Sequence, residues 1–185
     1  MDLDTAIKSR RSVRHFTSKT PDWRDIIECI DSARYAPMAG KNFILKFILI
    51  DDPEKIIKIS ESCQQDFVAE AQYVVVVCSD DSRIRNMFGE RGKEFVRQES
   101  GAAIENFLLK IVEKGLSTCW VGHFVEDEIK NLLKIPEKSR IEALFPIGYE
   151  AKKPLLRNWR IELDRILFFN EYKNKKMKEI KKVYT

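Results

Sequence analysis

The sequence has little of the cysteine and histidine that metal sites and disulfide frameworks require. Its 185 residues include four cysteines and two histidines, and no two cysteines form a C-x-x-C pair. This usage provides none of the common zinc-ligand spacings and is typical of a reducing, cytoplasmic setting. No apolar run approaches the roughly 20 residues that a membrane-spanning helix needs, and no signal peptide is visible. We therefore expect no metal centre and no membrane partner.

Several nucleotide-binding and catalytic signatures are also missing. The chain has no G-x-x-x-x-G-K-[ST] phosphate loop, no G-x-G-x-x-G turn and no G-x-S-x-G nucleophile elbow. Carboxylates are plentiful, but no two of them stand out as an acid and base couple. His15 and His123 are too far apart in the sequence to suggest a shared role. These absences set aside the standard phosphate-loop, dinucleotide-fold and serine-hydrolase chemistries.

The chain has no net charge outside its C-terminal 15 residues. The formal net charge is +4, and residues 171–185 contain six lysines and two glutamates. The other 170 residues carry 27 basic and 27 acidic side chains, which argues against a nucleic-acid partner because such domains usually present a basic face. No repeat or low-complexity linker appears. We expect one domain over residues 1–170, followed by a basic tail over 171–185.

Helical and strand-like patterns alternate along the chain, which indicates an α/β or α+β fold with helices packed on a sheet. The four consecutive valines of residues 71–80 predict a central strand that is covered on both faces. The expected helices cover residues 2–9, 20–36, 52–63, 99–115 and 126–135, and the other expected strands cover 46–51, 117–124 and 142–150.

A dense basic segment, SRRSVRHF, occupies residues 9–16. Arginine presents a planar fork of donors that matches phosphate oxygens, and a serine hydroxyl adds another donor. In an extended segment Arg10, Ser12 and Arg14 point the same way, because side chains alternate along a strand. The spacing alone leaves three interpretations open: a solvated turn, a nucleic-acid contact, or a cradle for one anion.

Four segments occur in one order along the chain. They are RRSVRHF at 10–16, APMAGKNF at 36–43, the stretch from FGERGKEF to CWVGHF at 88–124, and FPIGYEAKKP at 145–154. This series resembles the nitroreductase family of flavin oxidoreductases over residues 5–170. The resemblance implies an α+β fold with a mainly antiparallel central sheet flanked by helices. It also implies an intertwined homodimer with FMN bound at the subunit interface.

The resemblance further implies which residues contact the FMN. Arg10 and Ser12 match the residues that hold its phosphate, with Arg11 beside them, and Arg14 matches the residue at the pyrimidine edge. A positive charge there favours reduction, because the reduced flavin carries negative charge near that edge. The remaining implied contacts are Pro37, Met38, Ala39 and Gly40 from the partner subunit, Val121, Gly122 and His123 along the ring, Gln64 (or Gln65) at the pyrimidine ring, and Arg157 or Arg160 at the phosphate.

The implied reaction passes electrons from NAD(P)H through the flavin N5 to a small organic acceptor, such as a nitroaromatic or a quinone. No catalytic side chain is expected, because the cofactor carries the chemistry. Three positions depart from the family pattern: Met38 replaces a serine, Lys41 replaces an asparagine, and Phe43 begins a stretch that usually reads Q-P-W. These departures keep open an alternative, a protein that binds FMN without reductase turnover.

Overall fold

The computed structural model describes residues 1–152 and 160–177. The chain divides into two compact units, Met1–Lys153 and Pro154–Thr185. In the described part of the second unit the only helix is α7 (Leu163–Ile166). The expected boundary at residue 170 between a domain and a basic tail stays a prediction. The remaining helices and strands all belong to the first unit.

Four strands of the first unit form one sheet in the order β1-β2-β4-β3, and every pairing in it is antiparallel. The central strand β2 is paired on both sides, and all seven of its residues are buried. This arrangement confirms both the α+β class and the central position expected of the valine run. The strands are β1 (Leu45–Ile50), β2 (Tyr73–Ser79), β3 (Ser117–Thr118) and β4 (Arg140–Gly148).

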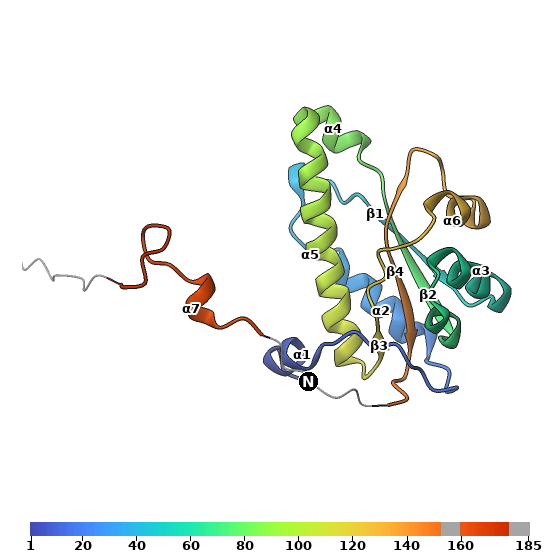
Figure 1. Ribbon diagram of the computed structural model, residues 1–185. Coiled ribbons are helices and arrows are strands. Elements are labelled where there is room, and N and C mark those ends of the chain that lie inside the picture. Colours follow the sequence, from blue (N-terminus) through green and yellow to red (C-terminus); the bar gives the residue numbers. More distant parts are fainter. Residues whose placement is uncertain (153–159, 178–185) are drawn as a thin grey trace, which may run out of the picture. The chain divides into compact units, whose positions relative to one another are not determined.

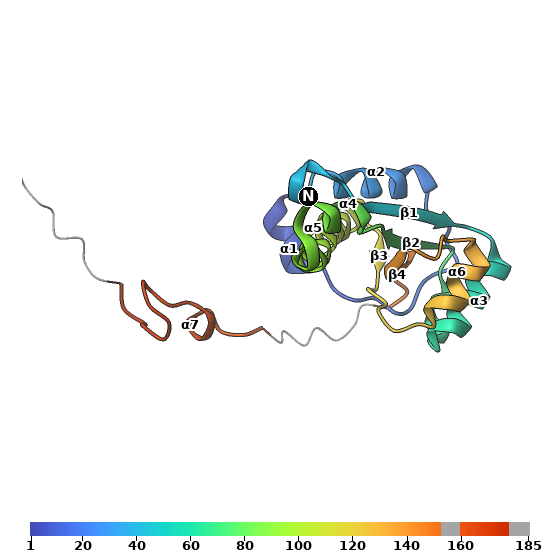
Figure 2. The ribbon, with the colours of Figure 1, turned by 90° about the horizontal axis from the view of Figure 1, so that it is seen from above.

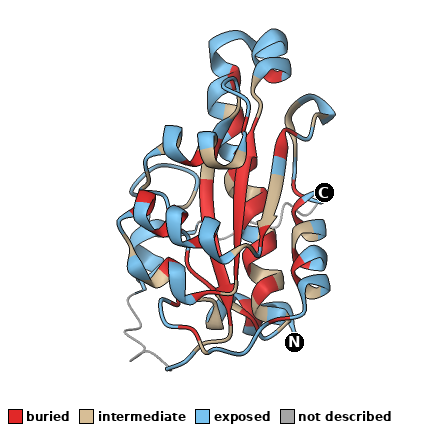
Figure 3. Cartoon of the chain, turned by 90° about the vertical axis from the view of Figure 1, so that its right-hand side faces the viewer, coloured by how far each residue is buried: buried red, intermediate tan, exposed pale blue. Residues whose placement is uncertain are grey.

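Helices cover both faces of this sheet (Figures 1 and 2). One face packs against α2 (Trp23–Ala33) and α5 (Gly92–Glu113), and the other against α3 (Pro53–Cys63) and α6 (Glu126–Leu133). The valine run supplies both cores, since Val75 and Val77 belong to the first and Val74 and Val76 to the second. Strand residues alternate between faces, so a covered strand must be apolar at every position. Figure 3 shows the burial concentrated in the strands.

The remaining elements are short, and they surround the ends of the sheet. They are α1 (Leu3–Ser9) and α4 (Ser82–Phe88), with the 3-10 helices η1 (Ala39–Lys41), η2 (Asp66–Glu70) and η3 (Gly89–Arg91).

Two helix starts differ from the expectation. The N-cap of α2 is Asp22 rather than Thr20, because the Asp22 carboxylate accepts a hydrogen bond of 2.9 Å from the Arg24 backbone N–H. Helix α5 begins at Gly92 instead of residue 99, and α4 was not expected at all. A Cβ at Gly92 would lie 2.9 Å from the Ile84 carbonyl oxygen, so this glycine lets α5 begin closely packed on α4. Residues 92–98 are rich in charged side chains and show no clear apolar periodicity, so their helical conformation was not expected from the sequence. Packing against α4 stabilises it.

All four cysteines are buried free thiols, as cysteines that serve as small core residues usually are. Burial raises the thiol pKa of Cys29 and Cys63 to about 12, which leaves them protonated and unreactive near neutral pH. In residues 1–152 and 160–177, no group of three or more metal-ligating side chains lies together. The same residues contain no helix with the length and apolar character required to cross a membrane.

Candidate functional site

The basic segment that follows α1 is held in an extended conformation against the end of the sheet. The Val13 N–H donates to the Thr118 carbonyl oxygen of β3 at 2.9 Å, and the Thr17 N–H donates to the Tyr149 carbonyl oxygen at 2.8 Å. The Ala151 N–H in turn donates to the His15 carbonyl oxygen at 2.9 Å. Between these bonds the buried ring of Phe16 packs against Gly148. The sheet therefore determines where the arginines lie.

Arg10, Arg11 and Ser12 line a cavity of about 530 Å³. Its other walls come from the last turns of α5, from β3 and from the end of β4. Apolar side chains form much of these walls, among them Leu108, Ile111, Leu116 and Trp120. A cavity of this size, mainly apolar with a few polar groups at one side, is typical of sites for organic ligands with a charged end.

The two arginines at the mouth of this cavity differ in their partners. Arg11 forms a two-point ion pair with Glu150, whose side chain is only 13% exposed, and its Nε lies 3.2 Å from Glu150 Oε1. Arg10 has a weaker contact, with its Nε 3.8 Å from Glu105 Oε1 and both side chains well exposed. Exposed pairs of this kind contribute about 0–1 kcal/mol. Arg10 is therefore available to an anion, whereas Arg11 is held in the structure.

Two hydroxyl groups on the same cavity have no partner among the described residues. The Thr118 Oγ1 atom is buried and makes no hydrogen bond there, and Ser12 is exposed with its side chain equally unengaged. A buried polar group without a partner costs about 1–3 kcal/mol, which a bound ligand would recover. Arginine and hydroxyl donors beside an apolar wall match the phosphate and the aromatic rings of a flavin mononucleotide. The residues present thus fit the cofactor that the resemblance implies.

The other implied ring contacts lie outside this cavity. Arg14 is exposed, and its guanidinium sits 5.8 Å from the centroid of the Phe67 ring. Val121 is buried and exchanges two backbone hydrogen bonds of 3.0 Å with Leu144. Gly122 and His123, which follow it, are exposed.

Gln64, the implied polar contact, does not line the cavity either. Gln64 caps the C-terminus of α3 in the left-handed conformation, with φ of 54°. Arg160 belongs to the second unit, and Arg157 lies outside the described residues.

The loop with Pro37, Met38, Ala39 and Gly40 is placed at the other end of α5. Its first three residues line a separate cavity of about 330 Å³ together with residues 95–102 of α5. Gly40 has φ of 57°, a left-handed conformation that favours glycine, and a Cβ there would lie 2.7 Å from Cε, the flexible end of the Met87 side chain. Within this chain, therefore, the loop and the Arg10 cavity are two sites rather than one.

Glu99 of α5 holds this loop, and the sequence reasoning missed it. One carboxylate oxygen accepts a hydrogen bond from the Ala39 N–H, and the other is buried without a partner in the described structure. Glu99 is 9% exposed, and burial raises the pKa of its carboxyl above the usual value. The available signal was a glutamate four positions before Ala103 on the apolar face of the expected helix. The sequence also gave no indication that Glu105, Glu150 and Trp120 line the Arg10 cavity.

Replacing Glu99 by glutamine should reduce the fall in stability as pH rises from about 5 to about 8. A carboxyl with a raised pKa binds its proton more tightly in the folded state. The free energy of unfolding therefore decreases as pH rises from the unfolded to the folded pKa, and glutamine lacks this titration. Urea unfolding of Glu99→Gln and the wild type at both pH values measures the difference. Glu94→Gln, at an exposed position of α5, is the control, and equal pH slopes in all three proteins would contradict the prediction.

The model of the nitroreductase family matches this chain over residues 7–66 and 57–149, which contain the basic segment, the Pro37–Gly40 loop and most of the cavity walls. The chain belongs to the nitroreductase family. The expectation drawn from the four ordered segments is thereby confirmed, as is the prediction of an oxidoreductase of this family.

Relatives agree with this assignment in sequence and in fold. The chain is 31% identical to a putative NADH dehydrogenase/NAD(P)H nitroreductase of Methanothermobacter thermautotrophicus, over 85% of this chain and 82% of the relative. The NADPH:FMN oxidoreductase of Vibrio harveyi, complexed with NAD+, has a TM-score of 0.81 at 20% identity, covering 93% and 78% of the two chains. An FMN-dependent nitroreductase of Clostridium difficile has a TM-score of 0.77 at 22% identity, covering 91% and 99%.

Proposed function

We propose that this nitroreductase-family protein binds FMN and uses NAD(P)H to reduce a small organic acceptor of the nitroaromatic or quinone type. The observation that carries the proposal is the 530 Å³ cavity, where Arg10, Ser12 and the unpartnered Thr118 hydroxyl lie together beside an apolar wall. The names of the relatives support it, since they include an NADPH:FMN oxidoreductase and an FMN-dependent nitroreductase.

In this proposal the chain's own residues bind and orient the cofactor. Arg10 and Ser12 donate to the phosphate oxygens, and the Glu150 carboxylate keeps Arg11 in place beside them. The apolar wall around Trp120 excludes water from the ring. When bound, FMN supplies the capacity to take up a hydride from NAD(P)H and to release electrons to the acceptor. No side chain of this protein is required as a nucleophile or general acid.

The placement of the Pro37–Gly40 loop supports a homodimer. This loop is implied to contact FMN, yet it lines a cavity different from that of Arg10 within one subunit. A second subunit that brings its loop to the first subunit's Arg10 cavity would account for both observations. Analytical ultracentrifugation measures the mass of the protein loaded with FMN, and a monomer at enzyme-assay concentrations would contradict this part of the proposal.

The visible spectrum tests the proposal directly. We expect the purified protein to be yellow, or to become so on adding FMN, with saturable quenching of flavin fluorescence. Adding NADH or NADPH without oxygen should bleach the flavin band, and a quinone or nitroaromatic should restore it. A protein that stays colourless and does not bind FMN refutes the proposal. FMN binding without bleaching by either nucleotide would favour the alternative of a flavin-binding protein without turnover.

A further inference from the structure

A separate polar cavity, of about 240 Å³, lies at the end of α5 farthest from the Arg10 cavity. Residues of the first turns of α5 line it, whereas residues of the last turns line the Arg10 cavity. Its other walls are the end of β2, the start of β4 and helix α4. Five basic side chains surround it: Arg85, Lys93, Arg97, Lys138 and Arg140.

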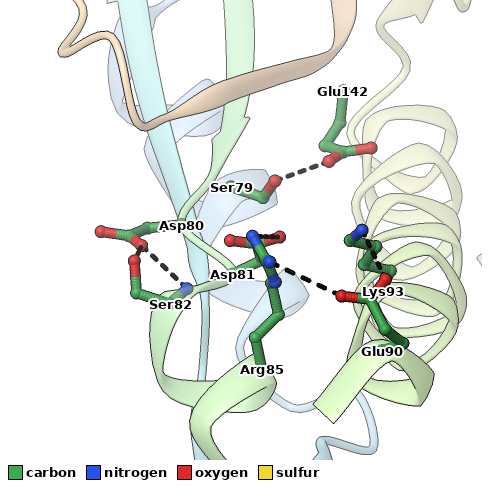
Figure 4. Close-up of polar contacts among 8 residues, drawn as sticks. All are labelled: Ser79, Asp80, Asp81, Ser82, Arg85, Glu90, Lys93 and Glu142. Carbon is green, nitrogen blue, oxygen red and sulfur yellow. Dashed lines mark hydrogen bonds and ion pairs between the residues drawn. The ribbon is translucent and has the colours of Figure 1, made fainter.

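Three of these cations already have carboxylate partners. The ion pairs join Lys138 to Asp80 (2.7 Å), Lys93 to Glu90 (2.6 Å), and Arg85 to both Asp81 (3.9 Å) and Glu90 (3.7 Å). Figure 4 shows Arg85 and Lys93 converging on Glu90 from α4 and α5. These ion pairs fix the positions of the three basic side chains and partly neutralise their charge, so they are less available to a bound anion.

Glu142, an acidic residue of strand β4, also lines this cavity. Glu142 accepts a hydrogen bond of 2.6 Å from the hydroxyl of Ser79, which is 3% exposed (Figure 4). Within residues 1–152 and 160–177, Glu142 forms no ion pair with the neighbouring arginines of the cavity, Arg97 and Arg140.

Arg97 of α5 and Arg140 of β4 have neither an ion pair nor a hydrogen bond from their side chains within residues 1–152 and 160–177. They come from two different elements and line one concave space. A guanidinium is a planar fork that matches the oxygens of a phosphate group, and two of them can hold one such group from two sides. Pockets that hold a whole organic ligand usually have a volume of about 300 Å³ or more, and this cavity is smaller.

We propose that Arg97 and Arg140 form a phosphate-binding site that is distinct from the flavin cavity. Its occupant is a single phosphate group, either free in solution or carried by a larger molecule whose remainder lies outside the cavity. The site does not depend on the flavin, since none of its residues lines the Arg10 cavity.

Calorimetric titration of inorganic phosphate into the FMN-saturated protein tests the site. We expect saturable binding that weakens roughly tenfold or more in the double variant Arg97→Gln/Arg140→Gln, because charge-assisted bonds to two guanidiniums are lost. Arg83→Gln is the matched control, because Arg83 lies on α4 next to the cavity region but does not line it, and it should bind phosphate like the wild type. Equal affinity in the double variant, or no saturable binding in the wild type, overturns the proposal.

The same titration in Arg10→Gln separates this site from the Arg10 cavity. Phosphate binding that disappears in Arg10→Gln and persists in the double variant belongs to the flavin cavity, and it also overturns the proposal. If FMN does not bind at all, the proposed function fails, but the comparison between Arg97→Gln/Arg140→Gln and Arg83→Gln still decides whether the second site exists.

Steady-state kinetics distinguish free phosphate from a phosphate group carried by NADPH. This experiment rests on the proposed function, because it requires reductase activity. If the occupant is the 2′-phosphate of NADPH, the double variant raises the KM for NADPH several-fold and leaves the KM for NADH unchanged. If both values stay unchanged while phosphate binding is lost in calorimetry, the site takes free phosphate. Both results support the site, and they assign different ligands to it.

Discussion

We expect Arg10→Ala to weaken FMN binding about tenfold to a hundredfold, the equivalent of roughly 1.5–3 kcal/mol for a lost charge-assisted hydrogen bond. The reason is the geometry of the cavity mouth. Arg10 has only a 3.8 Å contact with Glu105, whereas Arg11 is bound to the nearly buried Glu150. Arg10 is therefore the guanidinium that a phosphate can recruit without breaking a strong pair. Fluorescence titration of FMN against the apoprotein measures the change.

Arg14→Ala is the matched control for this prediction. It removes the same charge from the same extended segment, but Arg14 does not line the cavity and stacks over Phe67. We expect it to leave FMN affinity within about threefold and to lower the reduction potential of the bound flavin, since it is implied at the pyrimidine edge. Equal and negligible effects of both variants on affinity and potential would show that the basic segment does not hold the flavin.

Much of the fold could be predicted because its signals are local. The valine run of β2 is apolar at every position, and this pattern is diagnostic of a strand covered on both faces. Asp52 and Pro53 mark the start of α3 by elementary capping rules, and the Asp52 carboxylate does accept from the Glu54 N–H at 3.0 Å. The early part of α5 could not be predicted, because Gly92 and the charged residues after it gain their helical conformation from packing on α4.

Only those residues of the candidate site that are contiguous in the sequence could be predicted. The cluster of Arg10, Arg11 and Ser12 is contiguous, and the structure places all three on one cavity. The partner of Arg10, Glu105, lies on α5, and the partner of Arg11, Glu150, follows β4. A single carboxylate in a charged sequence gives no sign of its partner. Pairings of this kind depend on the register of the sheet, which no local pattern in the chain specifies.

Gly148→Ala should destabilise the protein by about 1–3 kcal/mol and weaken FMN binding at the same time. A Cβ at Gly148 would lie 2.9 Å from the Phe16 Cδ1 atom and 3.2 Å from the Phe16 Cβ and Cγ atoms, so the ring and its backbone must move. Phe16 lies in the segment that begins with Arg10, and it forms an isolated antiparallel bridge with Glu150, which follows β4. Urea unfolding and FMN titration of the same variant measure both effects.

The control is Gly101→Ala, which adds the same methyl group within α5, where no atom lies within 4 Å of the new Cβ. There alanine should leave stability unchanged or increase it by up to about 1 kcal/mol, because it is the better helix former. Phe16→Leu in the Gly148→Ala background removes the crowded ring and should restore part of the lost FMN affinity. Such a rescue would establish that Gly148 acts through the position of the basic segment, and an additive double variant would show that it does not.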